Sequence, residues 1–206
     1  MSEAAPGRPD PAARPLKINL GCGGKRIAGF VGVDVADLPA VDVKMDVRAY
    51  LRSLEPGSVS DVYSRHFLEH VDGAALRDLL LEIDRVLQPG GRIEFIVPHF
   101  SNPYYYSDPT HRQPFGVHTF SYLCERTCLR RGVPNYAAIP GWSLVDVKLW
   151  FLPYGQPRLL GLKVPMLSRL LNRVVNRGHL AIELFERYCC WWLTIYEVKF
   201  RIEKRG

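Results

Sequence analysis

Short apolar runs alternate with polar or glycine-rich stretches over the first half of the chain. Between two of them, apolar residues recur at helical spacing from Leu76 to Leu87, after a predicted N-cap at Asp72 and before the turn Pro89-Gly90-Gly91. Strands that alternate with crossovers in this way indicate a parallel sheet covered by helices. Five of the apolar runs predict buried strands, at residues 17–20, 30–35, 41–45, 59–64 and 92–98.

The C-terminal part has a different pattern, in which strand-like runs at 142–152 and 194–203 flank a helical insert of about residues 156–193. The second run alternates apolar and polar residues imperfectly, which indicates an antiparallel strand. Within the insert, a predicted helix begins at Pro165 and ends at Gly178, with an apolar stripe on one side and arginines on the other. Three roles for residues 158–193 stay open: part of the core or a lid, a homodimer interface, and contact with an anionic membrane surface.

The composition is that of a globular protein: 206 residues, 47% hydrophobic and 23% charged, which excludes a disordered or collagen-like chain. We expect residues 1–15, rich in alanine and proline, to form a disordered tail and residues 16–206 to form one domain. The sequence has neither an apolar run long enough for a membrane-spanning helix nor the apolar segment of a secretory signal. The five cysteines include no C-x-x-C pair, so we expect no disulfide framework and a reducing, cytoplasmic environment.

The net charge of +6 comes from 27 basic and 21 acidic side chains, and basic residues are frequent after Arg126. A basic C-terminal half could bind nucleic acid, an anionic membrane surface or a phosphorylated substrate. It could also be a solvated basic face with no partner. Nucleic acid is the least favoured of these partners, because the sequence contains no recognisable RNA-binding module.

A glycine-rich loop, Asn19–Gly24, follows the first predicted strand. The dinucleotide fingerprint G-x-G-x-x-G would need glycine where Arg26 stands, and no G-K-[ST] follows, so neither a nicotinamide site nor a P-loop is predicted. Asp34 ends the second strand, where a carboxylate can accept hydrogen bonds from ribose hydroxyls. Asp46 ends the third, in reach of an adenine amino group, although either aspartate could instead be a helix N-cap.

The ordered set of motifs resembles a class I S-adenosylmethionine-dependent methyltransferase, in the branch with L-E-H after the fourth strand and R-V-L-x-P-G-G before the fifth. The resemblance covers about residues 16–123 and implies S-adenosylmethionine as the cofactor. It implies a Rossmann-like sheet of seven strands, mostly parallel with an antiparallel last strand. The segments that carry it are INLGCGG, GFVGVDV, KMDV, VSDVYSRHFLEHV and LEIDRVLQPGGRIEFIVP.

The same resemblance implies roles for individual residues. Asp34 would bind the ribose, and Glu69 and His70 would hold the local loop by hydrogen bonds. The chain departs from the family between Gly23 and Asp34, where 11 positions leave room for a turn but not for the usual helix. The remaining implied contacts are Gly21, Cys22 and Gly23 with the methionine part, Asp46 and Val47 with the adenine, and Ser64, Arg65 and His66 with the methyl-transfer side.

Two other motifs have look-alikes that the sequence disfavours. His66 to His70 has the H-x-x-E-H spacing of an inverted zinc-protease motif, but Val71-Asp72-Gly73 interrupts the helix that such a site needs. Asn102-Pro103-Tyr104-Tyr105 resembles the N-P-P-Y signature of nitrogen methylation, but it follows the fifth predicted strand and not the fourth.

The segment after the fifth predicted strand gathers His99, Asp108, His111 and His118 around three consecutive tyrosines. A histidine–aspartate pair can remove the proton of a hydroxyl that attacks the methyl group. We therefore assign His99, Asp108 and His111 to acceptor and proton handling. In the alternative, Asp108 caps a turn against which His111 packs. Metal binding by this cluster is the less favoured alternative, and no metal is predicted.

The prediction is methyl transfer from S-adenosylmethionine to a small-molecule or glycan-type acceptor, with an oxygen as the favoured acceptor atom. One alternative is a nucleic-acid methyltransferase, which the basic half of the chain would suit. Another is a non-catalytic protein that binds the cofactor or acts as a scaffold, which the short first crossover would suit.

Overall fold

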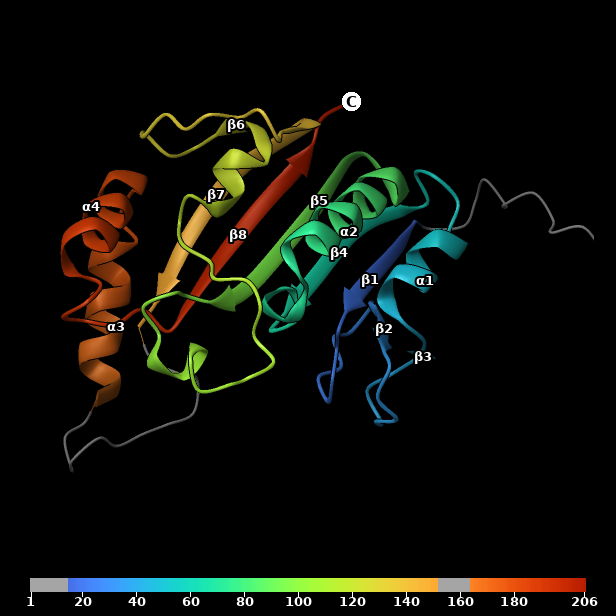
Figure 1. Ribbon diagram of the computed structural model, residues 1–206, viewed down its shortest axis with the longest axis horizontal. Coiled ribbons are helices and arrows are strands. Elements are labelled where there is room, and N and C mark those ends of the chain that lie inside the picture. The colour runs from blue at the N-terminus through green and yellow to red at the C-terminus, as the bar shows by residue number, and fades with distance from the viewer. Residues whose placement is uncertain (1–14, 152–163) are drawn as a thin grey trace, which may run out of the picture.

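The computed structural model describes residues 15–151 and 164–206, with the side chains of the second part described from residue 168 onward. Its centre is an eight-stranded sheet with the order β3-β2-β1-β4-β5-β8-β7-β6 (Figure 1). The 3-10 turns are η1 (Leu68–His70), η2 (Pro103–Tyr105) and η3 (Thr119–Tyr122). The strands and helices are, in chain order, β1 (Leu16–Leu20), β2 (Val31–Asp34), β3 (Val43–Lys44), α1 (Val47–Ser53), β4 (Val59–Arg65), α2 (Gly73–Val86), β5 (Leu87–Pro98), β6 (Cys124–Thr127), β7 (Ile139–Trp150), α3 (Val164–Val175), α4 (His179–Cys189) and β8 (Glu197–Lys204).

The strand directions match the expected sheet, with one addition. The last strand, β8, lies between β5 and β7 and is antiparallel to both, whereas the other pairs are parallel. The prediction of an antiparallel last strand is therefore confirmed. The count of seven is wrong by one, because the short segment β6 pairs with β7 at the edge of the sheet.

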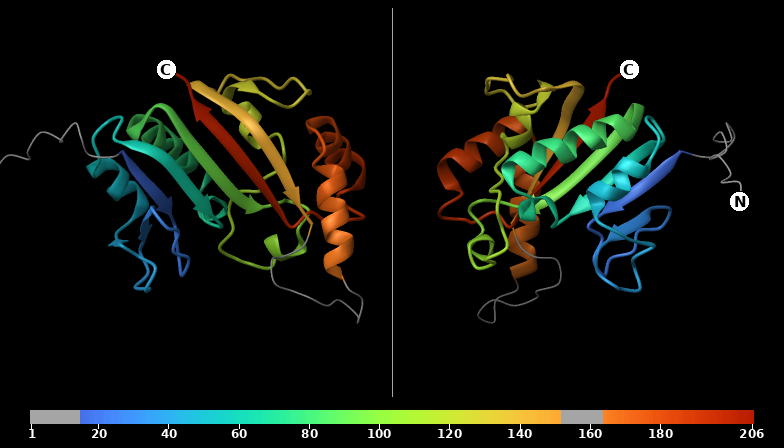
Figure 2. Two further views of the ribbon diagram at one scale, coloured as in Figure 1. Left: turned by 180° about the vertical axis from the view of Figure 1, so that it is seen from behind. Right: turned by 45° about the vertical axis from the view of Figure 1, so that its right-hand side comes forward.

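In the part of the chain that the structure describes, the helices that cover the sheet lie on one of its faces (Figure 2). Helices α1 and α2 pack on that face, and the segment after β5 extends the cover across β8. The rings of Phe95, Phe120 and Phe200 pack in tilted arrangements within this layer; the Phe120 centroid lies 5.3 Å from that of Phe95 and 4.7 Å from that of Phe200. Only turns join β1 to β2 and β2 to β3, so these crossovers supply no helix for the other face.

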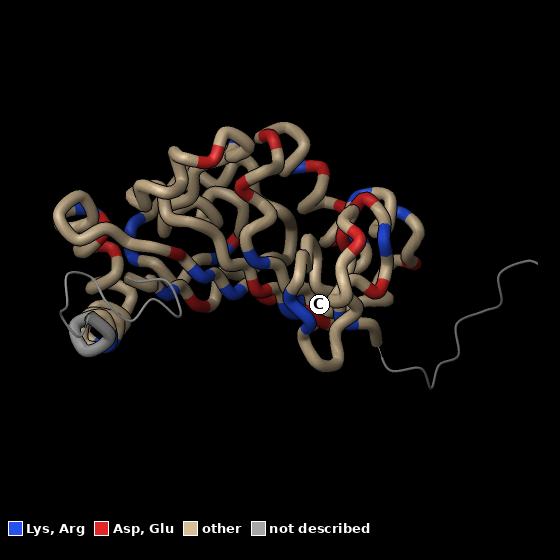
Figure 3. Tube along the Cα trace, turned by 90° about the horizontal axis from the view of Figure 1, so that it is seen from below, with Lys and Arg blue, Asp and Glu red and all other residues tan. Residues whose placement is uncertain are grey.

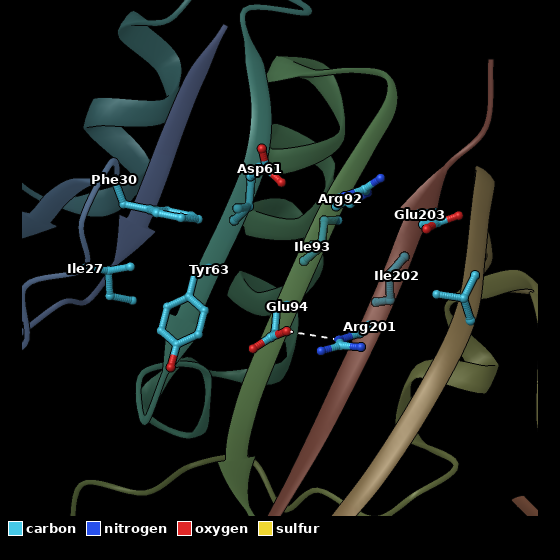
Figure 4. Close-up of a pocket in the computed structure, with 12 residues that line it drawn as sticks. Ile27, Phe30, Asp61, Tyr63, Arg92, Ile93, Glu94, Arg201, Ile202 and Glu203 are labelled. Carbon is cyan, nitrogen blue, oxygen red and sulfur yellow. Dashed lines mark hydrogen bonds and ion pairs between the residues drawn. The ribbon is translucent and has the colours of Figure 1, made fainter. Parts of the chain in front are cut away.

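The uncovered face carries charged side chains that neutralise one another. Lys17 pairs with Asp61 at 3.1 Å, and Glu94 pairs with Arg201 at 3.1 Å and with Lys199. A shallow groove of about 600 Å³ runs over this ladder (Figure 4). Because Asp61, Glu94 and Arg201 of its lining are ion-paired within the sheet, we do not regard the groove as the reaction site.

Helices α3 and α4 pack against the end of β7. Val175 and Ile182 join the core, and the Asn176 amide makes two hydrogen bonds of 2.8 Å with the backbone N–H and C=O of Leu149. The predicted first helix of the insert exists, but it begins at Val164 and ends before Gly178, which is the N-cap residue of α4. The outer side of the pair leaves apolar side chains exposed, among them Leu170, Leu184, Trp191 and Trp192.

The structure bears only in part on the predictions for the tail, the insert and the charge distribution. Most of the expected tail and residues 152–163 of the insert lie outside the described residues. Lys and Arg positions are interleaved with Asp and Glu along the described chain (Figure 3). Within the described residues, none of the helices has the length and apolar character needed to cross a bilayer.

Candidate active site

A cavity of about 310 Å³ opens where β1 and β4 end. The two strands are parallel neighbours with Leu20 opposite Ser64, so the glycine loop after β1 lies beside the residues that end β4. Such a position, outside the carboxyl ends of parallel strands, is where ligands bind in open sheets of this kind. The cavity is lined by Asn19, Gly21, Cys22, Lys25, Tyr63, Arg65 and His66.

Gly21 is required by the local backbone and by its neighbour. Its φ of +62° lies in the left-handed region, and a Cβ there would lie 2.5 Å from Cγ of Phe67. Gly23 also has a positive φ, of +50°, but no atom lies within 4 Å of its added Cβ. The loop therefore presents bare backbone to the cavity at Gly21, as close approach to a ligand needs.

Asp34 holds this loop from the end of β2. Its Oδ2 accepts a hydrogen bond of 2.8 Å from Gly23 N–H, and its Oδ1 accepts one of 2.9 Å from Ala36 N–H. A carboxylate has about four acceptor sites, so both oxygens keep capacity for further donors. The short spacing from Gly23 to Asp34 is accommodated by turns without a helix, as expected.

Asp46 is a helix cap in the structure. Its Oδ1 accepts hydrogen bonds of 3.0 Å from the backbone N–H groups of Arg48 and Ala49, and buried Val47 begins α1. Neither Asp46 nor Val47 lines the cavity. Asp46 and Val47 are linked to the glycine loop only through their neighbour Met45. The N–H of Met45 donates a 3.0 Å hydrogen bond to the backbone carbonyl of Asp34, whose side chain holds that loop.

Arg65 and His66 share one carboxylate, which the sequence analysis did not identify. Oε1 of Glu197 lies 2.7 Å from Nη2 of Arg65 and 2.6 Å from Nε2 of His66. Glu197 begins β8 and is buried; burial alone would raise its pKa, but the hydrogen bonds from His66 and Arg65 lower it. His66 has a φ of +57°, and it alone among the described non-glycine residues has a positive φ. Ser64 does not line the cavity; its hydroxyl donates to the Leu20 carbonyl at 3.0 Å.

The L-E-H motif forms the 3-10 turn η1. The carboxylate of Glu69 is fully buried, and neither of its oxygens has a hydrogen-bond partner among the described residues. Burial raises the pKa of Glu69 to about 7. Its backbone carbonyl, and not its side chain, holds the loop that follows β5, through Arg112 N–H at 2.7 Å and Gln113 N–H at 3.1 Å. His70 holds the same loop by a 2.9 Å hydrogen bond between its Nδ1 and Thr110 Oγ1.

Asp108 and His111 lie together beside that turn. Oδ2 of Asp108 is 3.7 Å from Nε2 of His111, whose Nδ1 donates to the Tyr105 carbonyl at 2.8 Å. Oδ1 of Asp108 also accepts from the N–H and hydroxyl of Thr110, at 2.8 Å and 2.6 Å, and these bonds lower the pKa of Asp108. The aspartate thus shapes a turn that His111 faces, as in the second of the two alternatives, and the role of the pair in acceptor and proton handling stays a prediction.

His99 lies apart from this pair. It is fully buried, with Nε2 at 2.8 Å from Oε1 of Glu186 on α4 and Nδ1 at 2.9 Å from Oγ of Ser101. His118 also faces α4, with Nε2 3.6 Å from Oε1 of Glu183. The histidine-rich segment is therefore divided: His111 faces the turn η1, whereas His99 and His118 face the insert.

Comparison with known proteins gives a consistent result. Residues 18–95 match the family model described as "Methyltransferase domain", and no curated protein matches the chain. The fold is similar to that of a SAM-dependent methyltransferase from Archaeoglobus fulgidus, with a TM-score of 0.55 and 20% identity, covering 92% of this chain and 86% of that one.

Two further solved structures have similar folds. The YcgJ protein of Bacillus subtilis has a TM-score of 0.50 and 12% identity, covering 94% of this chain and 93% of that one. Phosphoethanolamine N-methyltransferase 2 of Haemonchus contortus, solved with phosphomonomethylethanolamine and S-adenosylhomocysteine, has a TM-score of 0.50 and 12% identity. That match covers 95% of this chain and 51% of the other.

Proposed function

We propose that the chain is a class I S-adenosylmethionine-dependent methyltransferase, as its match to a methyltransferase-domain model over residues 18–95 and its methyltransferase-like fold support, and that it methylates an oxygen of a small-molecule or glycan-type acceptor. The observation that carries the proposal is the cavity after β1 and β4, with the polar cluster of Glu69, His70, Asp108 and His111 next to it. The contact between the two is direct, since Nδ1 of His66 in the cavity wall lies 3.7 Å from Oε1 of Glu69.

The residues of the cavity fit the cofactor. Gly21 leaves no room for a side chain of its own, and the backbone from Gly21 through Cys22 to Gly23 is available for the methionine part. The remaining acceptor capacity of Asp34 suits two ribose hydroxyls. We place the adenine toward Asp46 and Val47, which follow the backbone contact between Met45 and Asp34.

When bound, S-adenosylmethionine supplies a methyl group on a sulfonium, and its carbon–sulfur bond breaks as the acceptor oxygen bonds to that carbon. Glu197 holds Arg65 and His66 rigidly on this side of the cavity, so their side chains would orient the acceptor. The acceptor hydroxyl must lose its proton, and Nε2 of His111 supported by Asp108 is a suitable place for it. His99 is buried against Glu186, so we do not assign it a direct contact with the acceptor.

The experiment is a calorimetric titration of S-adenosylhomocysteine into the full chain and into Asp34→Ala, followed by a screen of hydroxylated metabolites and glycans for S-adenosylhomocysteine release. Asp37→Ala is the matched control, because Asp37 is exposed and pairs only with Lys44 among the described residues. We expect micromolar binding that Asp34→Ala weakens at least about tenfold and Asp37→Ala leaves unchanged. A folded wild-type protein that binds no S-adenosylhomocysteine and releases none with any acceptor would contradict the proposal and favour a scaffold role.

A further inference from the structure

We propose that Glu69, His70 and His111 bind a divalent metal ion of the zinc class beside the methyl-transfer side of the cavity. One ligand atom of each residue lies within 4.8 Å of the ligand atoms of the other two. Glu69 and His70 belong to the turn after β4, and His111 to the loop after β5. Because the backbone of Arg112 and Gln113 is hydrogen-bonded to the Glu69 carbonyl, the two segments are held together before any ion binds.

The Glu69 carboxylate needs a partner that the described residues do not provide. It is fully buried and both of its oxygens lack hydrogen bonds. A buried carboxylate is costly unless it is paired, hydrogen-bonded or bound to a metal. His66 Nδ1, at 3.7 Å, is too far away for a hydrogen bond. A cation at the cluster would satisfy this side chain.

The hydrogen bonds of the two histidines occupy Nδ1 of each ring and leave Nε2 available as a ligand; Nε2 of His111 also faces Oδ2 of Asp108 at 3.7 Å. Thr110 has one hydroxyl proton, which it donates to Asp108 at 2.6 Å, so it must accept the proton of His70 Nδ1 at 2.9 Å. The Tyr105 carbonyl can only accept, so His111 Nδ1 is also protonated. In neutral rings both Nε2 atoms then carry lone pairs. Donation from the other ring nitrogen to a carbonyl or hydroxyl is how metal-binding histidines are usually oriented.

The ligand set indicates which ion the cluster would take. Two imidazoles and one carboxylate suit Zn²⁺ and related transition metals, whereas Mg²⁺ and Ca²⁺ prefer oxygen ligands. A tetrahedral ion with bonds of ~2.1 Å holds its ligand atoms ~3.4 Å apart. Ligand atoms that now lie within 4.8 Å of one another would therefore approach by up to about 1.4 Å, through rotation of the side chains. Three protein ligands leave one position open, as in catalytic zinc sites.

A catalytic role for the open coordination position rests on the proposed function. Metal binding by Glu69, His70 and His111 does not depend on it. The cluster adjoins His66 in the cavity wall, so the open position would take the acceptor oxygen. An oxygen bound to such an ion gives up its proton near neutral pH. The proton would pass to water, and the oxygen lone pair would then bond to the methyl carbon as the carbon–sulfur electrons stay on sulfur. In the metal-bound protein His111 would be a ligand, so the base role proposed for its Nε2 above would apply to the metal-free protein alone.

The test is calorimetry with ZnCl₂ and, separately, MgCl₂ on full-length protein stripped with a chelator. The variants are Glu69→Gln, His70→Asn and His111→Asn. His179→Asn is the matched control, because that imidazole faces Asp146 at 3.6 Å on another part of the chain. We expect one zinc ion per chain, no comparable magnesium binding, and at least about tenfold weaker zinc binding in the three variants but not in the control. His70 is exposed, so His70→Asn keeps the test valid if Glu69→Gln does not fold.

Two results would overturn the site: no zinc binding by the folded wild-type protein, or equal zinc binding by wild type, His70→Asn and His111→Asn. S-adenosylhomocysteine is titrated into the same samples to separate this proposal from the proposed function. Cofactor binding without zinc binding removes the metal site and leaves the methyltransferase proposal standing. Zinc binding that the variants lose, in a protein that binds no cofactor, supports the metal site and contradicts the proposed function.

Discussion

The backbone N–H of Gly23 donates a 2.8 Å hydrogen bond to Oδ2 of Asp34, which joins the loop after β1 to the end of β2. In this chain the crossover between the two strands is too short to contain a helix, so no helix packs behind the loop. The Asp34 carboxylate therefore has two tasks in the proposed site: it fixes the glycine loop, and it keeps acceptor capacity for a ligand. Substitution at Asp34 is expected to affect both.

Gly21→Ala is expected to disrupt the loop, and Gly24→Ala is not. The added Cβ at Gly21 would clash with the Phe67 ring at 2.5 Å in a backbone with φ of +62°, whereas nothing lies within 4 Å of a Cβ at Gly24, where φ is not positive. We expect Gly21→Ala to lower the free energy of unfolding by about 1–3 kcal/mol and to weaken S-adenosylhomocysteine binding. Urea unfolding and calorimetry measure the two effects. Equal behaviour of the two variants would show that the close packing of Gly21 on Phe67 does not matter.

Glu197→Ala is expected to be strongly destabilising. It would leave Arg65 and His66 without the buried carboxylate that both contact, and breaking a buried ion pair from one side costs about 3–5 kcal/mol. Glu203→Ala is the control, because Glu203 lies on the same strand with an exposed side chain. Urea unfolding of the three proteins checks this. A loss in Glu197→Ala no larger than in the control would contradict the ionic link between β8 and the end of β4.

The contribution of Glu197 to stability should depend on pH. Its pKa is lowered in the folded protein by hydrogen bonds from His66 and Arg65, against the effect of burial. The stabilisation is therefore fully present above the unfolded-state pKa of about 4.3 and is lost as the pH falls through the lower folded-state pKa. We expect the difference in unfolding free energy between wild type and Glu197→Gln to shrink as the pH falls below about 4. A difference that does not shrink below about pH 4 would contradict the lowered pKa of Glu197.

His99→Ala is expected to reduce stability without changing cofactor affinity. The imidazole is buried between Ser101 and Glu186, so its removal leaves two polar partners unsatisfied, at a cost of about 2–3 kcal/mol. It does not line the cavity after β1. Thermal unfolding and calorimetry with S-adenosylhomocysteine separate the two effects. A large loss of S-adenosylhomocysteine affinity in a folded His99→Ala variant would contradict this prediction and indicate that His99 contributes to the reaction site.

Much of the fold could be predicted from sequence because its signals are local. The apolar runs of β1, β2, β4 and β5 and the periodicity of α2 are each contained within a short window. The ends of these strands place Gly21 and His66 in the cavity wall, and Asp34 beside the glycine loop, so part of the cavity could be predicted as well. The resemblance in motif order then supplied the class of cofactor.

Long-range pairing decided the rest. The four residues of β6 carry no strand signal of their own and become a strand by pairing with β7, which made the sheet one strand larger than predicted. Glu197 is separated from His66 by 131 positions and looks like one polar residue in an alternating run. The division of His99 from His111 depends on where α4 packs, since Glu186 takes one imidazole and leaves the other beside Glu69.

The sequence by itself determined the order of strands and loops and the chemistry at the strand ends, because periodicity and turn residues act over a few neighbours. Only the tertiary structure decided which charged groups meet, which face of the sheet stays open, and that Glu69 is buried without a hydrogen-bond partner among the described residues. Burial and pairing depend on segments far apart in the chain, and no local pattern records them.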